Sequence, residues 1–172
     1  MIRRALIVAS LLLAAPALAQ DRIVTERATF RVTTFATGLE HPWGAAFLPD
    51  GSLLVTERPG RLRRVTPDGQ VSAPLAGVPR VEAAGQGGLL DVALAPDFAR
   101  TREVFLCHAA AVDGGALTRL VSARLSPGND ALSGVRRLLD ATPAQSGGRL
   151  HFGCRIAFDR DGFLYLSTGE RN

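Results

Sequence analysis

The sequence predicts an all-β fold that forms part of a β-propeller. Beyond the first twenty residues there is almost no helical periodicity, and short runs rich in Val, Leu and Phe alternate with Pro-Asp-Gly, Arg-Pro-Gly and Asp-Gly turns. One strand-turn unit also repeats, because Ala46–Gly51 is echoed by Ala93–Phe98 and by Ala157–Gly162. Repeated antiparallel units of this kind are typical of propeller blades.

Residues 1–19 are predicted to be a signal peptide that is cut after Ala19. Arg3 and Arg4 precede an apolar run, and small residues stand where signal peptidase cleaves. An uncleaved membrane anchor is the alternative, but Pro16 interrupts the run, which is shorter than the roughly 20 apolar residues that a spanning helix needs. The mature protein is therefore expected in the periplasm or outside the cell, with no stable membrane span.

The mature chain is predicted to begin with an extension and a first strand in residues 20–36, followed by the propeller domain in residues 37–172. The first unit of that domain contains three consecutive candidate strands, separated by turns that contain glycine. They are Trp43–Leu48, Ser52–Thr56 and Arg61–Val65. Their order and short connections predict an antiparallel meander.

The spacing of the repeats predicts how many blades the chain holds. Ala46, Ala93 and Ala157 start the three units, 47 and then 64 residues apart, and the longer interval has room for a loop within Ser126–Ala144. Four-stranded blades recur every 40 to 50 residues or so, which predicts two to three blades. Because so few blades cannot close a ring, the chain is expected to be the N-terminal part of a longer propeller. A β-sandwich with accidental turn similarity is the alternative.

The composition and charge of the chain predict that it does not bind nucleic acid. The chain is 47% hydrophobic and 21% charged, which suits a protein that buries a core. Removal of the leader leaves 18 basic and 16 acidic residues. All the basic side chains are arginines, and they are scattered among acidic and apolar residues without forming a basic tract.

The two cysteines are predicted to be buried free thiols. Cys107 and Cys154 both lie inside apolar runs, and neither has the spacing of a metal ligand. A disulfide between them is the alternative, because export places the chain in an oxidising compartment.

Two polar side chains in glycine-rich loops are candidates for chemistry. His151 lies in Gly147–Ile156, and an imidazole can accept a hydroxyl proton near neutral pH. The Gln86 amide can orient a polyhydroxylated ligand or a cofactor carbonyl. The repeat places Glu40, Gly87 and His151 at equivalent positions before the first strand of each unit. If these strands line the propeller axis, the three loops approach one central site.

Each polar or aromatic residue in these loops also has a structural interpretation. A lone histidine such as His151 often stabilises a turn, and so does an amide such as Gln86. Asp91 is interpreted as a structural acceptor of loop hydrogen bonds, because an unpaired buried carboxylate would be costly. Trp43 could face a ligand but is predicted to belong to the core, and His108 is assigned to the surface or to packing.

The chain resembles the soluble quinoprotein sugar dehydrogenases, the glucose/sorbosone dehydrogenase-like family. The similarity runs from about Thr37 to Asn172 and rests on four ordered blocks. These are Gly38-Leu39-Glu40-His41-Pro42-Trp43-Gly44, Thr56-Glu57-Arg58-Pro59-Gly60-Arg61-Leu62, Gly85-Gln86-Gly87-Gly88-Leu89-Leu90-Asp91-Val92-Ala93-Leu94 and His151-Phe152-Gly153-Cys154-Arg155-Ile156.

The resemblance implies a six-bladed propeller that binds pyrroloquinoline quinone (PQQ) and calcium near its axis. His151 matches the family's catalytic base, which takes a proton from the hydroxyl of an aldose while hydride passes to the quinone. Gln86 matches the glutamine near substrate and cofactor, and an external acceptor takes the electrons. The calcium ligands and the quinone clamp are expected beyond Asn172, so no metal ligand is assigned within this chain, and residues 1–172 alone are expected to be inactive. A noncatalytic exported ligand-binding module is the alternative.

Overall fold

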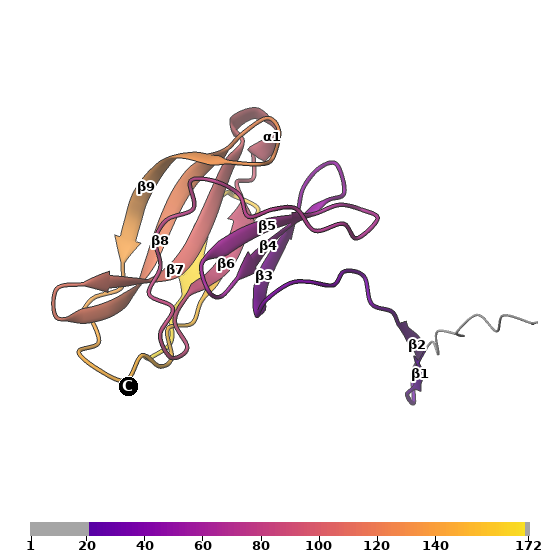
Figure 1. Ribbon diagram of the computed structural model, residues 1–172, viewed down its shortest axis with the longest axis horizontal. Coiled ribbons are helices and arrows are strands. Elements are labelled where there is room, and N and C mark those ends of the chain that lie inside the picture. The colour runs from indigo at the N-terminus through magenta and orange to yellow at the C-terminus, as the bar shows by residue number, and fades with distance from the viewer. Residues whose placement is uncertain (1–20, 171–172) are drawn as a thin grey trace, which may run out of the picture. The chain divides into compact units, whose positions relative to one another are not determined.

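The structure, a computed structural model, describes residues 21–170 (Figure 1). These residues form two compact units, and the boundary along the chain lies between Thr34 and Phe35. The predicted signal peptide lies outside the described residues. In the first unit, β1 (Asp21–Val24) and β2 (Thr29–Val32) form an antiparallel hairpin where the sequence predicted an extension with one strand.

The second unit begins with the predicted meander. It consists of β3 (Pro42–Phe47), β4 (Leu53–Glu57) and β5 (Arg61–Val65), paired antiparallel in that order. Gly51 and Gly60 occupy the two turns with φ of 80° and 113°, backbone conformations that side chains with a Cβ rarely adopt. The three strand predictions are therefore confirmed to within one residue.

The next sheet is a complete four-stranded blade. Its strands are β6 (Leu89–Leu94), β7 (Glu103–Val112), β8 (Gly115–Leu125) and β9 (Leu132–Asp140), with the short helix α1 (Phe98–Thr101) between the first two. A third sheet contains β10 (Arg155–Phe158) and β11 (Leu164–Ser167).

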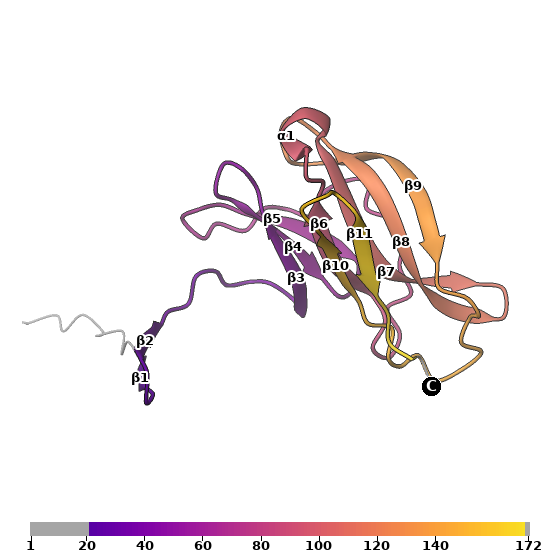
Figure 2. The ribbon, with the colours of Figure 1, turned by 180° about the vertical axis from the view of Figure 1, so that it is seen from behind.

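The first strands of the three sheets lie next to one another. Strand β6 contacts both β3 and β10, and Figure 2 shows β10 and β11 beside β6 and β7. Three consecutive antiparallel sheets whose first strands are neighbours form part of a β-propeller, and the sandwich alternative does not apply. In the part of the chain that the structure describes, no helix is long and apolar enough to cross a membrane.

The four-stranded sheet buries a separate apolar layer on each face. Alternate residues face opposite sides of a strand, so Leu89 and Leu106 enter one cluster, whereas Leu90 and Cys107 enter the other. The first cluster packs against the β3–β5 sheet and the second against the β10–β11 sheet. Full burial of each large side chain contributes about 1.5 to 3 kcal/mol, so these layers hold the three sheets together.

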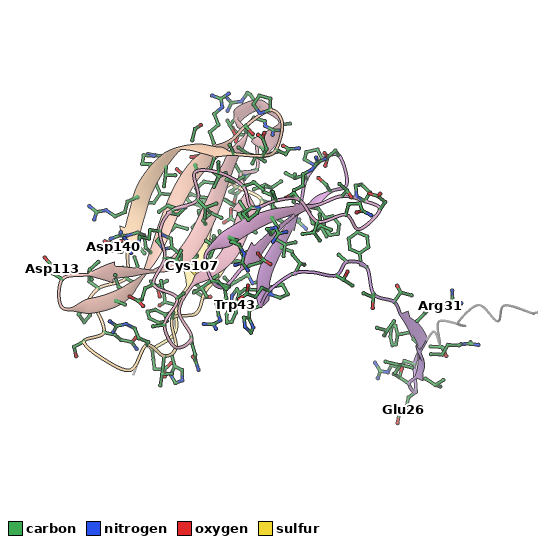
Figure 3. All side chains as sticks on the ribbon, viewed as in Figure 1. Glu26, Arg31, Trp43, Cys107, Asp113 and Asp140 are labelled. Atoms are coloured by element: carbon green, nitrogen blue, oxygen red, sulfur yellow. A yellow bond between two sulfur atoms is a disulfide. The ribbon has the colours of Figure 1, made fainter. Side chains whose placement is uncertain are left out.

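The prediction of two free thiols is wrong. Cys107 of β7, labelled in Figure 3, forms a disulfide with Cys154, and the two Cα atoms are 6.6 Å apart. Both cysteines lie in the apolar layer between the second and third sheets. The apolar flanking residues correctly indicated burial, but the pairing depends on how two sheets far apart in sequence pack together.

Trp43 is not the core residue that the sequence predicted, because 48% of its surface is exposed. Its neighbour Gly44 faces β6, where an added Cβ would lie 2.7 Å from Oδ1 of Asp91. Trp43 instead helps to line an open pocket together with Arg155 and residues 167–169. Figure 3 shows its side chain at the end of β3.

His108 belongs to the packed interior, with 2% of its surface exposed. Nδ1 lies 3.0 Å from the carbonyl oxygen of Ala109, and Nε2 is buried with no hydrogen-bond partner among the described residues. Burial lowers the pKa of this imidazole below its ordinary value, so the ring is neutral at physiological pH. The packing alternative for His108 is thus confirmed.

A buried carboxylate anchors the loop before β3 to the first sheet. The Glu57 side chain is fully buried, and its oxygens accept hydrogen bonds from the Glu40 backbone N–H at 2.5 Å, from Arg61 at 2.6 Å and from Arg63 at 3.2 Å. Arg61 also pairs with the Glu40 carboxylate at 2.6 Å. Burial alone would raise the pKa of Glu57, but these hydrogen bonds outweigh it and lower the pKa.

We expect Glu57 to make stability depend on pH in acid. Because folding lowers its pKa, its contribution is present above the ordinary value of 4.5 and is lost as pH falls through the folded value. Glu57→Gln should lower the free energy of unfolding at pH 7 by about 1 to 3 kcal/mol and weaken the acid dependence, measured by urea unfolding between pH 3 and 7. Asp50→Asn, at a more exposed carboxylate in the same unit, is the control with a smaller effect. Equal acid dependence in wild type and Glu57→Gln would contradict this prediction.

Candidate functional site

The His151 loop and the Gln86 loop hold each other through two hydrogen bonds. The His151 backbone N–H donates to Oε1 of Gln86 at 3.0 Å, and the Gln86 backbone N–H donates to the Arg149 carbonyl at 2.9 Å. Gly85 makes this approach possible, because a Cβ there would lie 2.4 Å from the Arg149 oxygen. The structure thus brings together the two residues that the sequence singled out.

The backbone of the His151 loop adopts uncommon conformations. Arg149 and His151 have φ of 54° and 49°, in the left-handed region that residues other than glycine seldom occupy. Such conformations persist where surrounding contacts impose them, and they are frequent at functional sites. The ring of His151 remains partly accessible, with 43% of its side chain exposed.

Glu170 is the partner of the His151 ring. A carboxylate oxygen of Glu170 hydrogen-bonds to Nδ1 of His151. The pKa of Glu170 is lowered by a hydrogen bond from its own backbone N–H and by the His151 ring, so the group is an anion at neutral pH. Gly169 lets the backbone come this close, because a Cβ there would lie 1.9 Å from the His151 carbonyl oxygen.

The segment after His151 is fixed to the four-stranded sheet. Phe152 has 1% of its surface exposed, and its carbonyl accepts a hydrogen bond of 2.7 Å from the Thr118 hydroxyl. Two residues later, Cys154 is bonded to Cys107. His151 therefore stands on a segment that is anchored by apolar burial, a buried hydrogen bond and a disulfide.

Asp91 joins β6 to β10. Its carboxylate is 1% exposed and accepts hydrogen bonds from the Ile156 backbone N–H at 2.7 Å and from Arg155 at 3.0 Å. The interpretation of Asp91 as a structural acceptor is confirmed, although its partners belong to a strand and not to a loop.

Two pockets are lined by Glu170 or by its neighbour Gly169. Glu170 lines one of about 420 Å³ together with residues 143–148. A second pocket, of about 580 Å³, is lined by Gly169, Arg155 and Trp43 among others, and by neither His151 nor Glu170. Within residues 21–170, no group of three or more His, Cys, Asp or Glu side chains lies close enough to hold a metal ion.

The repeat placed Glu40 and Gly87 at positions equivalent to His151, and the structure brings the Gly87 loop against the His151 loop. The Glu40 carboxylate binds Arg61, and Gly87 is buried in the loop that carries Gln86. The sequence analysis did not identify Glu170 as a partner of His151. The register of the β10–β11 hairpin could have indicated it. Arg155 pairs with Ser167, and extending that register brings residue 152 level with residue 170.

Comparisons with known proteins agree with this architecture. A family model described as Glucose / Sorbosone dehydrogenase matches residues 39–172. Aldose sugar dehydrogenase YliI of Escherichia coli strain K12 is 44% identical over 147 residues, which cover 84% of this chain and 39% of the relative. The chain thus spans about two fifths of that relative's length.

Two solved structures have the same fold over most of the chain. A crystal structure of glucose dehydrogenase has a TM-score of 0.77 and 46% identity, and the match covers 81% of this chain and 41% of that one. The PQQ-bound aldose sugar dehydrogenase from Streptomyces coelicolor has a TM-score of 0.71 and 34% identity, with coverage of 91% and 44%. The extent of the family match, together with this fold, shows that the chain belongs to the glucose/sorbosone dehydrogenase family.

Proposed function

We propose that this chain supplies the general base of a PQQ-dependent aldose sugar dehydrogenase, and that His151 is that base. The observation that carries the proposal is the hydrogen bond between Nδ1 of His151 and Glu170, beside Gln86. The relatives with the matching fold include an aldose sugar dehydrogenase and a PQQ-bound enzyme of the same kind, which supports the reaction class.

The pairing with Glu170 prepares the ring to accept a proton. An ionised carboxylate can only accept a hydrogen bond, so Nδ1 of His151 carries the hydrogen, and in the neutral ring the lone pair is on Nε2. In the proposed reaction, Nε2 takes the proton of the sugar hydroxyl as the C–H bond breaks and the C=O bond forms. Glu170 stabilises the positive charge that the ring then holds.

The residues around His151 fit a bound quinone. Oε1 of Gln86 is occupied by the His151 backbone N–H, so the two amide hydrogens of Gln86 are left to donate to a quinone or sugar oxygen. When bound, PQQ supplies the acceptor for the hydride that leaves the sugar carbon. Gln86 and His151 would lie against the quinone, and an external acceptor would take the two electrons afterwards.

We assign no calcium ligand among residues 21–170. No cluster of three or more candidate acidic, His or Cys ligands lies within residues 21–170, and we route no step through the metal. We therefore propose that calcium and the quinone clamp are bound by other parts of the full-length protein. The 172-residue polypeptide alone should then reduce no dye in the presence of aldose, PQQ and calcium.

We also propose that the protein is exported. The leader in residues 1–19 would be removed after Ala19, and the propeller domain that starts near residue 37 would act in the periplasm or outside the cell. Mass spectrometry of the N-terminus of the exported protein tests the cleavage site.

Dye reduction by the full-length protein tests the proposed function. The protein, purified and supplied with PQQ and calcium, should reduce an artificial acceptor only when an aldose is present. The competing function is noncatalytic ligand binding. Sugar binding detected by calorimetry, without reduction of the dye by the PQQ-loaded protein, would favour that competitor.

We expect Glu170→Gln to lower turnover of the full-length enzyme by about ten- to a hundredfold. The glutamine amide can also donate to Nδ1, so the ring can take the wrong tautomer and turn its proton toward the substrate. Initial rates across pH 5–9 measure the effect, which should be largest in turnover. Thr168→Ser, at the neighbouring rim of the second pocket, is the control. A turnover that is unchanged in Glu170→Gln would exclude this role for Glu170.

A further inference from the structure

Arg58 hydrogen-bonds to the loop that carries Gln86, residues 83–87. Its Nη1 donates to the carbonyl oxygens of Ala83 at 3.2 Å, Gly85 at 2.7 Å and Gly87 at 3.2 Å. These carbonyls belong to alternate residues of one loop, and Gln86 lies between the last two. The positively charged guanidinium thus binds three carbonyl oxygens of the loop and orients them toward Arg58.

The backbone of Arg58 is held by two hydrogen bonds, one to its N–H and one to its carbonyl oxygen. Its N–H donates to the His41 carbonyl at 3.0 Å, and its carbonyl accepts from the Leu89 N–H at 3.0 Å. Gly88 allows this packing, because a Cβ there would lie 2.0 Å from the Arg58 oxygen. The guanidinium therefore extends from a backbone that is held between His41, just before β3, and the start of β6.

Within the loop, the Gly87 N–H donates to the Ala84 carbonyl and the Ala84 N–H donates to the Glu82 carboxylate. Residues 83–86 are exposed, so apolar burial contributes little to their position. On its far side the loop makes the two contacts with the His151 segment, from the Gln86 N–H to Arg149 and from the His151 N–H to Gln86. Arg58 and the His151 segment thus hold the loop from two sides.

We propose that Arg58 is a positioning residue for the site, which orders residues 83–87 so that the Gln86 side chain meets the His151 backbone N–H. The inference rests on the proposed function for its catalytic consequence only. Lysine is a poorer replacement, because its flexible stem holds the ammonium less firmly in front of the three carbonyls than the pre-organised guanidinium is held. Arg58 touches neither reacting atom and acts through Gln86.

Hydrogen exchange of the full-length protein tests the ordering directly, without substrate. In Arg58→Met, amides in residues 84–88 and 149–153 should exchange at least about tenfold faster than in wild type. Arg64→Met is the matched control, because Arg64 binds Asp50 and Ser52 and should leave both segments unchanged. If Arg58→Met does not fold, Arg58→Lys is measured in its place. The same amides should then exchange faster than in wild type, by a smaller factor than the one expected for Arg58→Met. Unchanged exchange in a folded Arg58 variant would overturn the proposal.

A double-mutant cycle tests the route through Gln86. Arg58→Met should lower kcat/KM for the aldose by about ten- to a hundredfold, and by less than about threefold when Gln86 is already alanine. If the effects of the two substitutions on kcat/KM are additive, Arg58 does not act through Gln86, and the proposal is wrong. If the wild-type protein oxidises no aldose, the proposed function fails, and the exchange result alone decides whether Arg58 orders the loop.

Discussion

Replacement of His151 by alanine is expected to lower the turnover of the full-length enzyme by about 10² to 10⁴-fold, the usual contribution of a general base. The change removes the nitrogen that would accept the hydroxyl proton, whereas Gln86 keeps its contact because that contact uses the backbone N–H of residue 151. PQQ binding should therefore be largely retained. Steady-state dye reduction and a fluorescence titration with PQQ measure the two effects separately.

The control for this experiment is His41→Asn, which removes another exposed histidine of the described residues. His41 has φ of 47°, a conformation that asparagine tolerates, so the backbone should remain in place. Its turnover should stay within about threefold of wild type, as for most surface substitutions away from a reacting group. Added imidazole should also restore part of the activity of His151→Ala. Full turnover in His151→Ala would remove this residue from the mechanism.

Removal of the disulfide is expected to lower the free energy of unfolding by about 4 kcal/mol. The bond between Cys107 and Cys154 closes a loop with a sequence separation of 47, and chain entropy predicts roughly that stabilisation for a loop of this size. The paired change Cys107→Ala and Cys154→Ala also loosens the segment that carries His151. Urea unfolding of the full-length protein, followed by tryptophan fluorescence, gives the free energy.

Reductant supplies the control for the disulfide experiment. Dithiothreitol present during unfolding should move the transition of the wild type toward that of the double variant, and it should leave the variant unchanged. If the wild type and the variant unfold at the same urea concentration without reductant, the cross-link does not stabilise the folded state.

The strands and their turns could be predicted because they depend on nearby residues. In β3, β4 and β5 the alternation of side chains and the glycine turns are properties of short segments, and the boundaries agreed to within one residue. The repeat of these segments also predicted the partial propeller. Gln86 and His151 were found for the same reason, since each stands in a local glycine-rich pattern.

The errors arose where two sheets meet. Trp43 follows the pattern of a core residue, but 48% of its surface is exposed and it lines a pocket beside Arg155 of the third sheet. The cysteines were correctly placed in the interior, yet free thiols were preferred to the disulfide, because a sequence does not state which apolar layers face each other. Glu170 was missed because its relation to His151 depends on the register of a hairpin.

The sequence by itself determined the β-strands, the blade repeat and the identity of the two glycine-framed polar residues, because these follow from side-chain periodicity and from backbone conformations that only certain residues tolerate. Tertiary structure alone decided the partners. The contacts of His151 with Gln86 and Glu170, of Cys107 with Cys154 and of Arg58 with the Gln86 loop join segments 19 to 65 residues apart. The His151–Glu170 contact closes within one hairpin, whereas the others close only when whole sheets pack, so the chemistry of the site emerges from the assembly of the blades.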